Sequence, residues 1–144
     1  MKAQFLLVII VFFSFSSMGQ VGSNDCQKST PVFDYAEKMP EPTGGMDSLK
    51  TFFQRELISW GLNNETRQLD IDLLINKDGS ACPYLIHVAP YTLPTDKMTS
   101  SIKAMSRWKP GMQNGHNVDC YSKLSLQIDG GVLTKLVYRN SNNK

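Results

Sequence analysis

Residues 69–76 read LDIDLLIN, and residues 77–80 follow at once as KDGS. The first segment alternates, with Leu69, Ile71, Leu73 and Ile75 on one face and Asp70 and Asp72 on the other. A period of two places successive side chains on opposite faces of a β-strand, so this stretch predicts a strand with one buried and one solvated face. Because both aspartates fall on the solvated face, we interpret them as surface charges rather than as a paired-carboxylate catalytic site.

The residues after this strand predict a β-hairpin. Lys77-Asp78-Gly79 is a turn signal in which the glycine supplies a positive φ. A second strand is expected over about residues 81–89, and Pro83 lies inside it. Because proline has no N–H to donate to a ladder, we expect this strand at an edge of the sheet.

Two amphipathic helices flank the hairpin. Spacings of three and four predict a helix before it that ends at Gly61, with an apolar stripe of Met46, Leu49, Phe53, Leu57 and Trp60. A second helix is expected after Thr95 or Asp96, either of which can cap it, with Met98, Ile102, Met105 and Trp108 as its buried stripe. We interpret the aromatic side chains of both stripes as core packing.

The last third of the chain predicts more strand. Residues 118–128 alternate, with Leu124, Leu126 and Ile128 inward and Lys123, Ser125 and Gln127 outward. Asp129-Gly130-Gly131 is a second turn signal, and residues 132–139 could add a further strand before a frayed tail at residues 141–144.

This element order predicts an α+β domain: a three-stranded antiparallel sheet with two helices packed on one face. The second strand, the second helix and the third strand form a crossover unit, which is right-handed and makes its two strands parallel. The third strand is then antiparallel to the first. The expected strand order is second–first–third, with the C-terminal segment as an optional fourth strand.

Residues 1–19 predict a secretory signal peptide. Lys2 precedes an apolar run over residues 5–15, and Ser17 and Gly19 offer a small-residue cleavage pattern before Gln20. The alternative is an uncleaved anchor, but the run is shorter than the roughly 20 residues that a spanning helix needs. We therefore expect a periplasmic or secreted protein with a short polar leader over residues 20–38.

Composition narrows the function further. The chain has 144 residues with 15 basic and 13 acidic side chains, which fits one domain and argues against a nucleic-acid binder. No C-x-x-C pair occurs, and His87 and His116 lie far apart, so no zinc site and no other metal or cofactor is expected. No nucleophile–base pairing or glycine-rich phosphate loop is found either, so we expect no enzyme.

The three cysteines predict one disulfide, because an exported chain meets an oxidising compartment. In the strand order above, Cys82 and Cys120 begin the two strands that flank the first strand. Two strand spacings of ~4.8 Å separate them by about 10 Å, beyond the ~7 Å limit for a bridge. The disulfide is therefore expected to use Cys26, on the leader, with either Cys82 or Cys120.

Four segments, in this order and spacing, resemble the C-terminal domain of TonB proteins from Bacteroidetes-like bacteria. They are residues 39–46 with Pro40, Gly44 and Gly45; residues 75–80 with Asp78 and Gly79; residues 107–115 with Trp108, Pro110 and Gly111; and residues 118–128. The resemblance covers about residues 39–128 and leaves residues 129–144 as a C-terminal extension. The chain departs from the family in having Pro42 and Thr43 before Gly-Gly, and in lacking the membrane anchor and the long proline-rich spacer of full transducers.

The resemblance implies a non-catalytic periplasmic domain that docks on outer-membrane transporters and serves transmembrane transport. Docking would add a partner strand to the last family strand, whose outward positions are Tyr121, Lys123, Ser125 and Gln127. The C-terminal extension would then compete with the partner for that edge. The alternative is an envelope structural or assembly protein that reuses the fold without energy coupling. A homodimer through an exposed strand edge also remains open.

Overall fold

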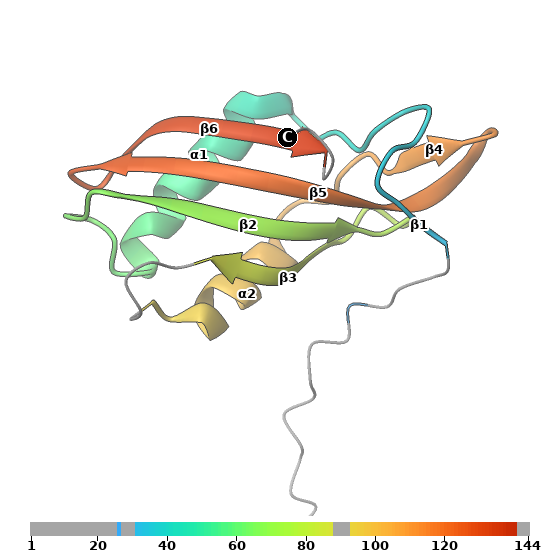
Figure 1. The fold of residues 1–144 in the computed structure, drawn as a ribbon. Coiled ribbons are helices and arrows are strands. Elements are labelled where there is room, and N and C mark those ends of the chain that lie inside the picture. Colours follow the sequence, from blue (N-terminus) through green and yellow to red (C-terminus); the bar gives the residue numbers. More distant parts are fainter. Residues whose placement is uncertain (1–25, 27–30, 88–92, 141–144) are drawn as a thin grey trace, which may run out of the picture.

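The computed structural model describes residues 26, 31–87 and 93–140, and it has an α+β fold with two helices and a mixed six-stranded sheet (Figure 1). In chain order the elements are β1 (Val32–Phe33), α1 (Gly45–Ser59), β2 (Arg67–Ile75), β3 (Ala81–His87), α2 (Thr95–Ala104), β4 (Gly111–Gln113), β5 (His116–Asp129) and β6 (Val132–Asn140). The expected signal peptide and residues 20–25 and 27–30 of the leader lie outside the described residues. The rest of the leader is not irregular throughout, because it contains β1, which pairs with β5. In the part of the chain that is described, no helix is long and apolar enough to cross a bilayer.

The sheet is built around β2 and β5. Strand β2 lies between β3 and β5 and is antiparallel to both, which is the neighbour order expected from the crossover argument. Pro83 lies on β3 at one margin of the sheet, which confirms the edge position expected for the second strand. Strand β6 pairs antiparallel with β5 along the side of β5 that faces away from β2.

The optional fourth strand is present as β6, but the expected antiparallel sheet of three or four strands is still too small. Strands β1, β4 and β6 also pair with β5, and β1 is parallel to it, which makes the sheet mixed. Strands β1 and β4 have only two and three residues, so neither is long enough to produce a readable alternation.

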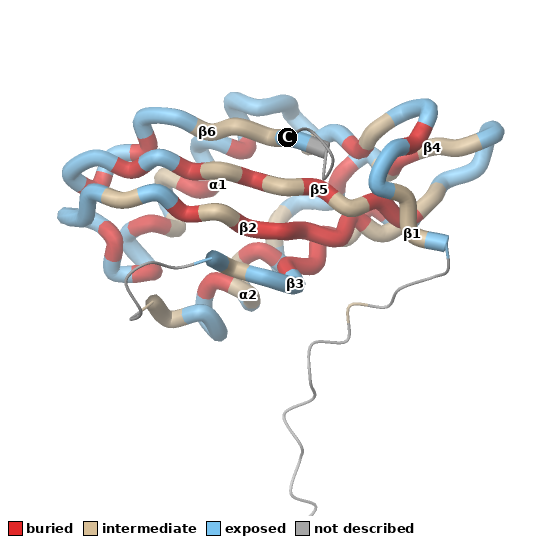
Figure 2. Tube along the Cα trace, viewed as in Figure 1, coloured by how far each residue is buried: buried red, intermediate tan, exposed pale blue. Residues whose placement is uncertain are grey.

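The hydrophobic core lies between one face of the sheet and the two helices. In Figure 1, α1 passes behind β2, β5 and β6, and α2 lies beside β3. The alternating side chains of β2 face this core, and Figure 2 shows the buried positions running along β2 and β5. The indole N–H of Trp60, just after α1, donates to Ser101 Oγ on α2 at 3.2 Å, which ties the two helices together. The buried members from these elements are Leu49, Phe53, Leu57, Leu69, Ile71, Leu73, Ile75, Met98, Ile102, Leu124, Leu126 and Ile128.

The second helix is shorter than its apolar spacing predicts. Helix α2 ends at Ala104, and Met105 is already extended, with φ −65° and ψ 160°. Trp108 is nevertheless buried, and its backbone N–H donates to the carbonyl of Gly79 at 2.7 Å. Its side chain reaches the core from a loop, so the helical spacing continues without a helix. The expected end of the second strand, residues 88–89, lies outside the described residues.

Candidate binding edge

The outward positions expected to receive a partner do not lie on an open edge. Tyr121, Lys123, Ser125 and Gln127 are on β5, and residues 122–128 of β5 pair with β2 on one side and with β6 on the other. The expected pairing of the C-terminal extension with β5 is therefore confirmed, and it closes the β5 edge to a partner at Lys123, Ser125 and Gln127. The cause is a tight hairpin, in which Gly130 and Gly131 adopt φ values of 55° and 81° and return the chain along β5.

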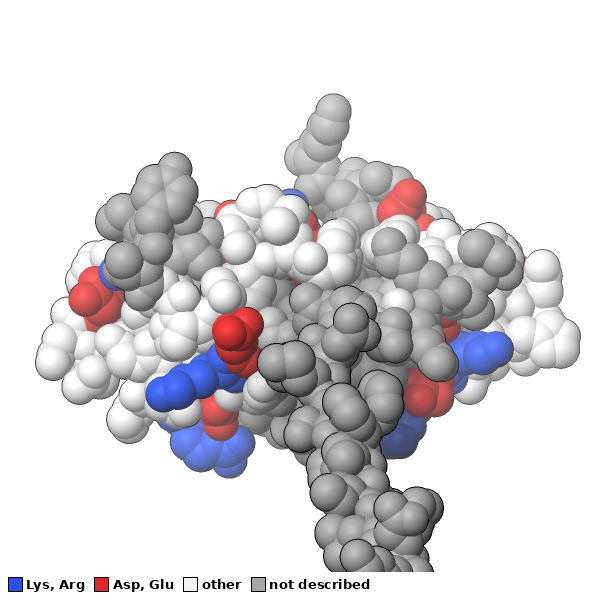
Figure 3. All heavy atoms as spheres, turned by 90° about the horizontal axis from the view of Figure 1, so that it is seen from below, with Lys and Arg blue, Asp and Glu red and all other residues white. Residues whose placement is uncertain are grey.

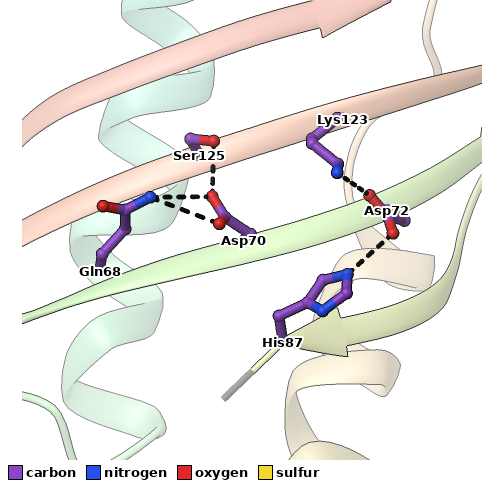
Figure 4. Close-up of polar contacts among 6 residues, drawn as sticks. All are labelled: Gln68, Asp70, Asp72, His87, Lys123 and Ser125. Atoms are coloured by element: carbon purple, nitrogen blue, oxygen red, sulfur yellow. Dashed lines mark hydrogen bonds and ion pairs between the residues drawn. The ribbon is translucent and has the colours of Figure 1, made fainter. Parts of the chain in front are cut away.

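Two of these outward residues instead contact the aspartates of β2 (Figure 4). Asp72 accepts from Lys123 Nζ at 3.3 Å and lies 2.9 Å from His87 Nε2. Asp70 accepts from Ser125 Oγ at 2.6 Å. Asp72 is only 8% exposed, so the expectation of a solvated carboxylate is wrong for this residue, because side chains from both neighbouring strands cover it.

This group of polar side chains is a cross-strand network on the helix-free face of the sheet. Both carboxylate oxygens of Asp72 have partners, so its burial is explained by these contacts and does not require a catalytic or ligand-binding role. Next to it, Tyr84 and Tyr121 make an edge-to-face ring contact at 5.4 Å. Burial, with the nearby Asp72 charge and Tyr121, raises the pKa of Tyr84 to about 12, so its phenol stays protonated at neutral pH.

The motif residues behind the TonB resemblance come together at one end of the sheet. Bridges pair Lys38 with Met112 and Glu41 with Lys109, so the segment around Pro40 lies beside Pro110 and Gly111. A Cβ on Gly79 would clash with the backbone carbonyl of Trp108, which explains the glycine there. The segment of residues 39–46 also contacts β6 and leads into α1. The carbonyl of Pro40 accepts from the Tyr138 hydroxyl of β6 at 2.8 Å, and Gly44, with φ 84°, is the N-cap residue of α1.

The turn residue of the motif is held by its own neighbours. Asp78 accepts from the hydroxyl of Ser80 at 2.6 Å and from its backbone N–H at 2.8 Å. These hydrogen bonds lower the pKa of Asp78, with Arg107 as a smaller electrostatic contribution. The motif positions therefore have structural explanations in turns and loop packing.

The outer side of β6, which faces away from β5, is the feature that the sequence analysis missed. We call it the β6 edge; it runs along Val132–Asn140. Strand β6 has nine residues, and among the described strands only β5 pairs with it. At its start, Gln54 of α1 occupies the backbone groups of the edge: its Oε1 accepts from Leu133 N–H at 2.7 Å and its Nε2 donates to the carbonyl of Gly131 at 3.1 Å. In a parallel sheet, one residue bonds to a carbonyl and to the N–H two residues later on the neighbouring strand. The Gln54 side-chain amide makes the same pair of bonds with Gly131 and Leu133.

Helix α1 and one hollow border this edge, and a second hollow lies on α1. A hollow of ≈ 470 Å³ lies at the far end of β6, where Tyr138 faces Met46 and Lys109. A second hollow of ≈ 470 Å³ lies on α1 and is lined by Lys50, Thr51, Gln54, Arg55 and Ile58. Met46, Lys50 and Gln54 follow each other at intervals of four, so they share one side of the helix. No local sequence signal identifies this surface, because Gln54 and Leu133 are 79 residues apart.

The cysteines occupy two separate places. A disulfide joins Cys26 to Cys82 with a Cα–Cα distance of 5.7 Å, one of the two pairings that the sequence left open. Cys120 is a buried free thiol, and burial raises its pKa to about 11, with the Asp119 charge as a lesser cause. Within the described ranges, no group of three or more His, Cys, Asp or Glu side chains could hold a metal ion.

Comparison with known proteins finds no matching family model, no similar curated protein and no similar solved structure. Function therefore has to be inferred from the residues and their geometry.

Proposed function

We propose that this chain is a non-catalytic, exported binding domain that receives an extended segment of a partner protein as an added strand on the β6 edge. The observation that carries the proposal is the contact of Gln54, whose amide already bonds to this edge as a neighbouring strand would. Beyond Leu133, the strand continues to Asn140 at the margin of the sheet without a second described strand. An extended peptide gains main-chain hydrogen bonds at such a margin.

The β6 edge is a better acceptor than the β5 edge, because a partner could reach β5 only by displacing β6, which is packed into the fold. Leu133 is 1% exposed and belongs to the core cluster, and the ring of Tyr138 contacts Trp108 in a tilted arrangement at 5.3 Å between ring centroids. A partner that displaced β6 would have to expose these side chains to water. We therefore propose that the C-terminal extension does not compete with the partner. Its strand β6 instead supplies the edge on which the partner docks.

The opposite margin, strand β3, is a poorer acceptor. Pro83 removes one backbone donor from it. Cys82 on the same strand is tied to Cys26. These are features that protect an edge against added strands.

In the cell, the proposed partner is an outer-membrane transporter or another envelope protein, which links the domain to transmembrane transport. This part of the proposal rests on the TonB-like segments and on the signal-peptide pattern. A disulfide between Cys26 and Cys82 fits an exported chain.

The test is site-specific photo-crosslinking in cells. A photoreactive residue replaces Val137, in the middle of the β6 edge, and in a matched control it replaces Lys97, an exposed residue of α2. We expect position 137 to attach to an envelope protein that position 97 does not reach. The proposal fails if position 137 yields no adduct, or yields the same adducts as position 97.

A further inference from the structure

The side chains of the β6 edge carry a distinctive charge pattern on the helix-free face of the sheet. Lys135, Val137 and Arg139 alternate onto this face, opposite Gln127, Ser125 and Lys123 of β5. Lys135 and Arg139 are exposed, and neither makes an ion pair with another described residue. The edge therefore presents two cations that have no ion-pair partner among the described residues, separated by one apolar side chain.

A carboxylate beside Arg139 would stabilise the protein more than one beside Lys135. It lies directly opposite Lys123, and like charges that face each other across strands are destabilising. Lys123 is compensated from its other side by Asp72 at 3.3 Å. Arg139 stands on the outermost strand, so the position left for a compensating carboxylate is on a strand added beyond β6.

The other charged groups near the β6 edge also leave it with a net positive charge, which favours a negatively charged partner. Lys50 of α1 is exposed, lies between Met46 and Gln54 on the side of the helix that borders β6, and makes no ion pair with a described residue. The nearby Glu41 is matched by Lys109 at 3.7 Å. On the side of the molecule shown in Figure 3, by contrast, several basic and acidic groups lie next to each other.

The same charges disfavour a second copy of the chain as the occupant. Antiparallel self-pairing centred on Val137 would place Lys135 of each copy opposite Arg139 of the other. Two such like-charge pairs oppose association, a common way in which natural sheets avoid edge-to-edge pairing.

Resting on the proposed function, we infer that the partner segment is acidic, with two carboxylate side chains four residues apart and an apolar residue midway between them. In an added strand, positions j, j+2 and j+4 lie on one face, opposite Lys135, Val137 and Arg139 in either strand direction. The two carboxylates then meet the two cations, and the apolar residue meets Val137.

Two synthetic peptides test this inference. One has glutamate at its third and seventh positions, valine at the fifth and threonine elsewhere in nine residues; the other has glutamine in place of both glutamates. Affinity is measured by fluorescence anisotropy, and the binding place by amide hydrogen exchange of β6. We expect the glutamate peptide to bind about 2- to 30-fold more tightly, as two exposed cross-strand ion pairs would allow. We expect this preference to weaken as salt rises.

Charge reversal supplies the matched control. The double variant Lys135→Glu/Arg139→Glu should lose or invert the preference. Lys97→Glu/Lys103→Glu makes the same change in net charge on α2 and should keep it; urea unfolding checks that both variants fold. Equal protection of β6 by both peptides would overturn the acidic specificity and leave strand addition standing. If neither peptide protects β6 and position 137 also fails to crosslink, strand addition itself is wrong.

Discussion

Replacing Leu133 with alanine tests whether the C-terminal strand belongs to the fold. Leu133 is 1% exposed and packs in the same core cluster as the helices. Its neighbour Val132 is 56% exposed, although the two lie on the same strand. The pair therefore separates burial from strand position.

The expected loss of stability follows from the carbon atoms removed. Leu→Ala withdraws burial equivalent to about three methylene groups at ~0.8 kcal/mol each, or about 2.4 kcal/mol. A residual cavity adds to this, and measured Leu→Ala substitutions in cores cost about 2–5 kcal/mol. At the margin of the sheet the neighbours can close part of the cavity, so we expect Leu133→Ala to lower the free energy of unfolding by about 2–3 kcal/mol.

Urea unfolding of the oxidised protein measures this change, with the fluorescence of the buried Trp60 and Trp108 as the signal. With an m-value of about 1–3 kcal/mol/M, the midpoint should fall by roughly 0.7–3 M. Val132→Ala should change the free energy of unfolding by no more than about 0.5 kcal/mol. A loss below about 1 kcal/mol for Leu133→Ala, or one equal to that of Val132→Ala, would refute the integration of β6 into the core.

Three further measurements address other parts of the structure. Gly131→Ala should lower the thermal midpoint clearly, because the new Cβ would clash with the backbone of Asn63 and the residue has φ +81°; an unchanged midpoint in calorimetry would contradict the tight hairpin. Burial raises the pKa of Cys120 from 9.0 to about 11, so the folded state holds this proton more tightly and its contribution to stability is lost as pH rises from 9 to 11; urea titrations should show that Cys120→Ala removes this alkaline component, and equal pH profiles would count against it. Asp72→Asn should lower the pKa of Tyr84 from about 12 toward 10 while leaving the burial contribution, and an unchanged tyrosinate titration by absorbance would show that the two groups are not coupled.

The features predictable from the sequence are those with a local cause. The alternation from Leu69 predicts the strand β2 and its core-facing side chains, because side-chain direction in a strand depends only on the parity of the position. The expected solvated face is wrong at Asp72 and Leu74, which are buried. Pro83 indicates an edge strand because its missing N–H is a property of one residue. The positive φ of Gly79 likewise follows from a short turn between two strands.

The mistaken expectations concern residues whose setting depends on distant parts of the chain. Trp108 keeps a helical spacing yet lies in a loop, since burial requires only that a side chain reach the core. Asp72 alternates like a solvated residue, but Lys123 and His87 from the two adjacent strands cover it. Strand parity identifies the face of a residue and does not identify its neighbours across the sheet.

By itself, the sequence determined two amphipathic helices, the central strand with its hairpin, and the tight turn at Gly130-Gly131, because each arises from spacing or backbone freedom within a few residues. The sequence left open whether the C-terminal extension pairs with β5, and only the tertiary structure decided it. The pairing of β6 with β5 closes the side expected to receive a partner, and the contact of Gln54 with Leu133 borders a new one. Edges are what remains after all strands have paired, so they depend on long-range pairing that local periodicity does not contain.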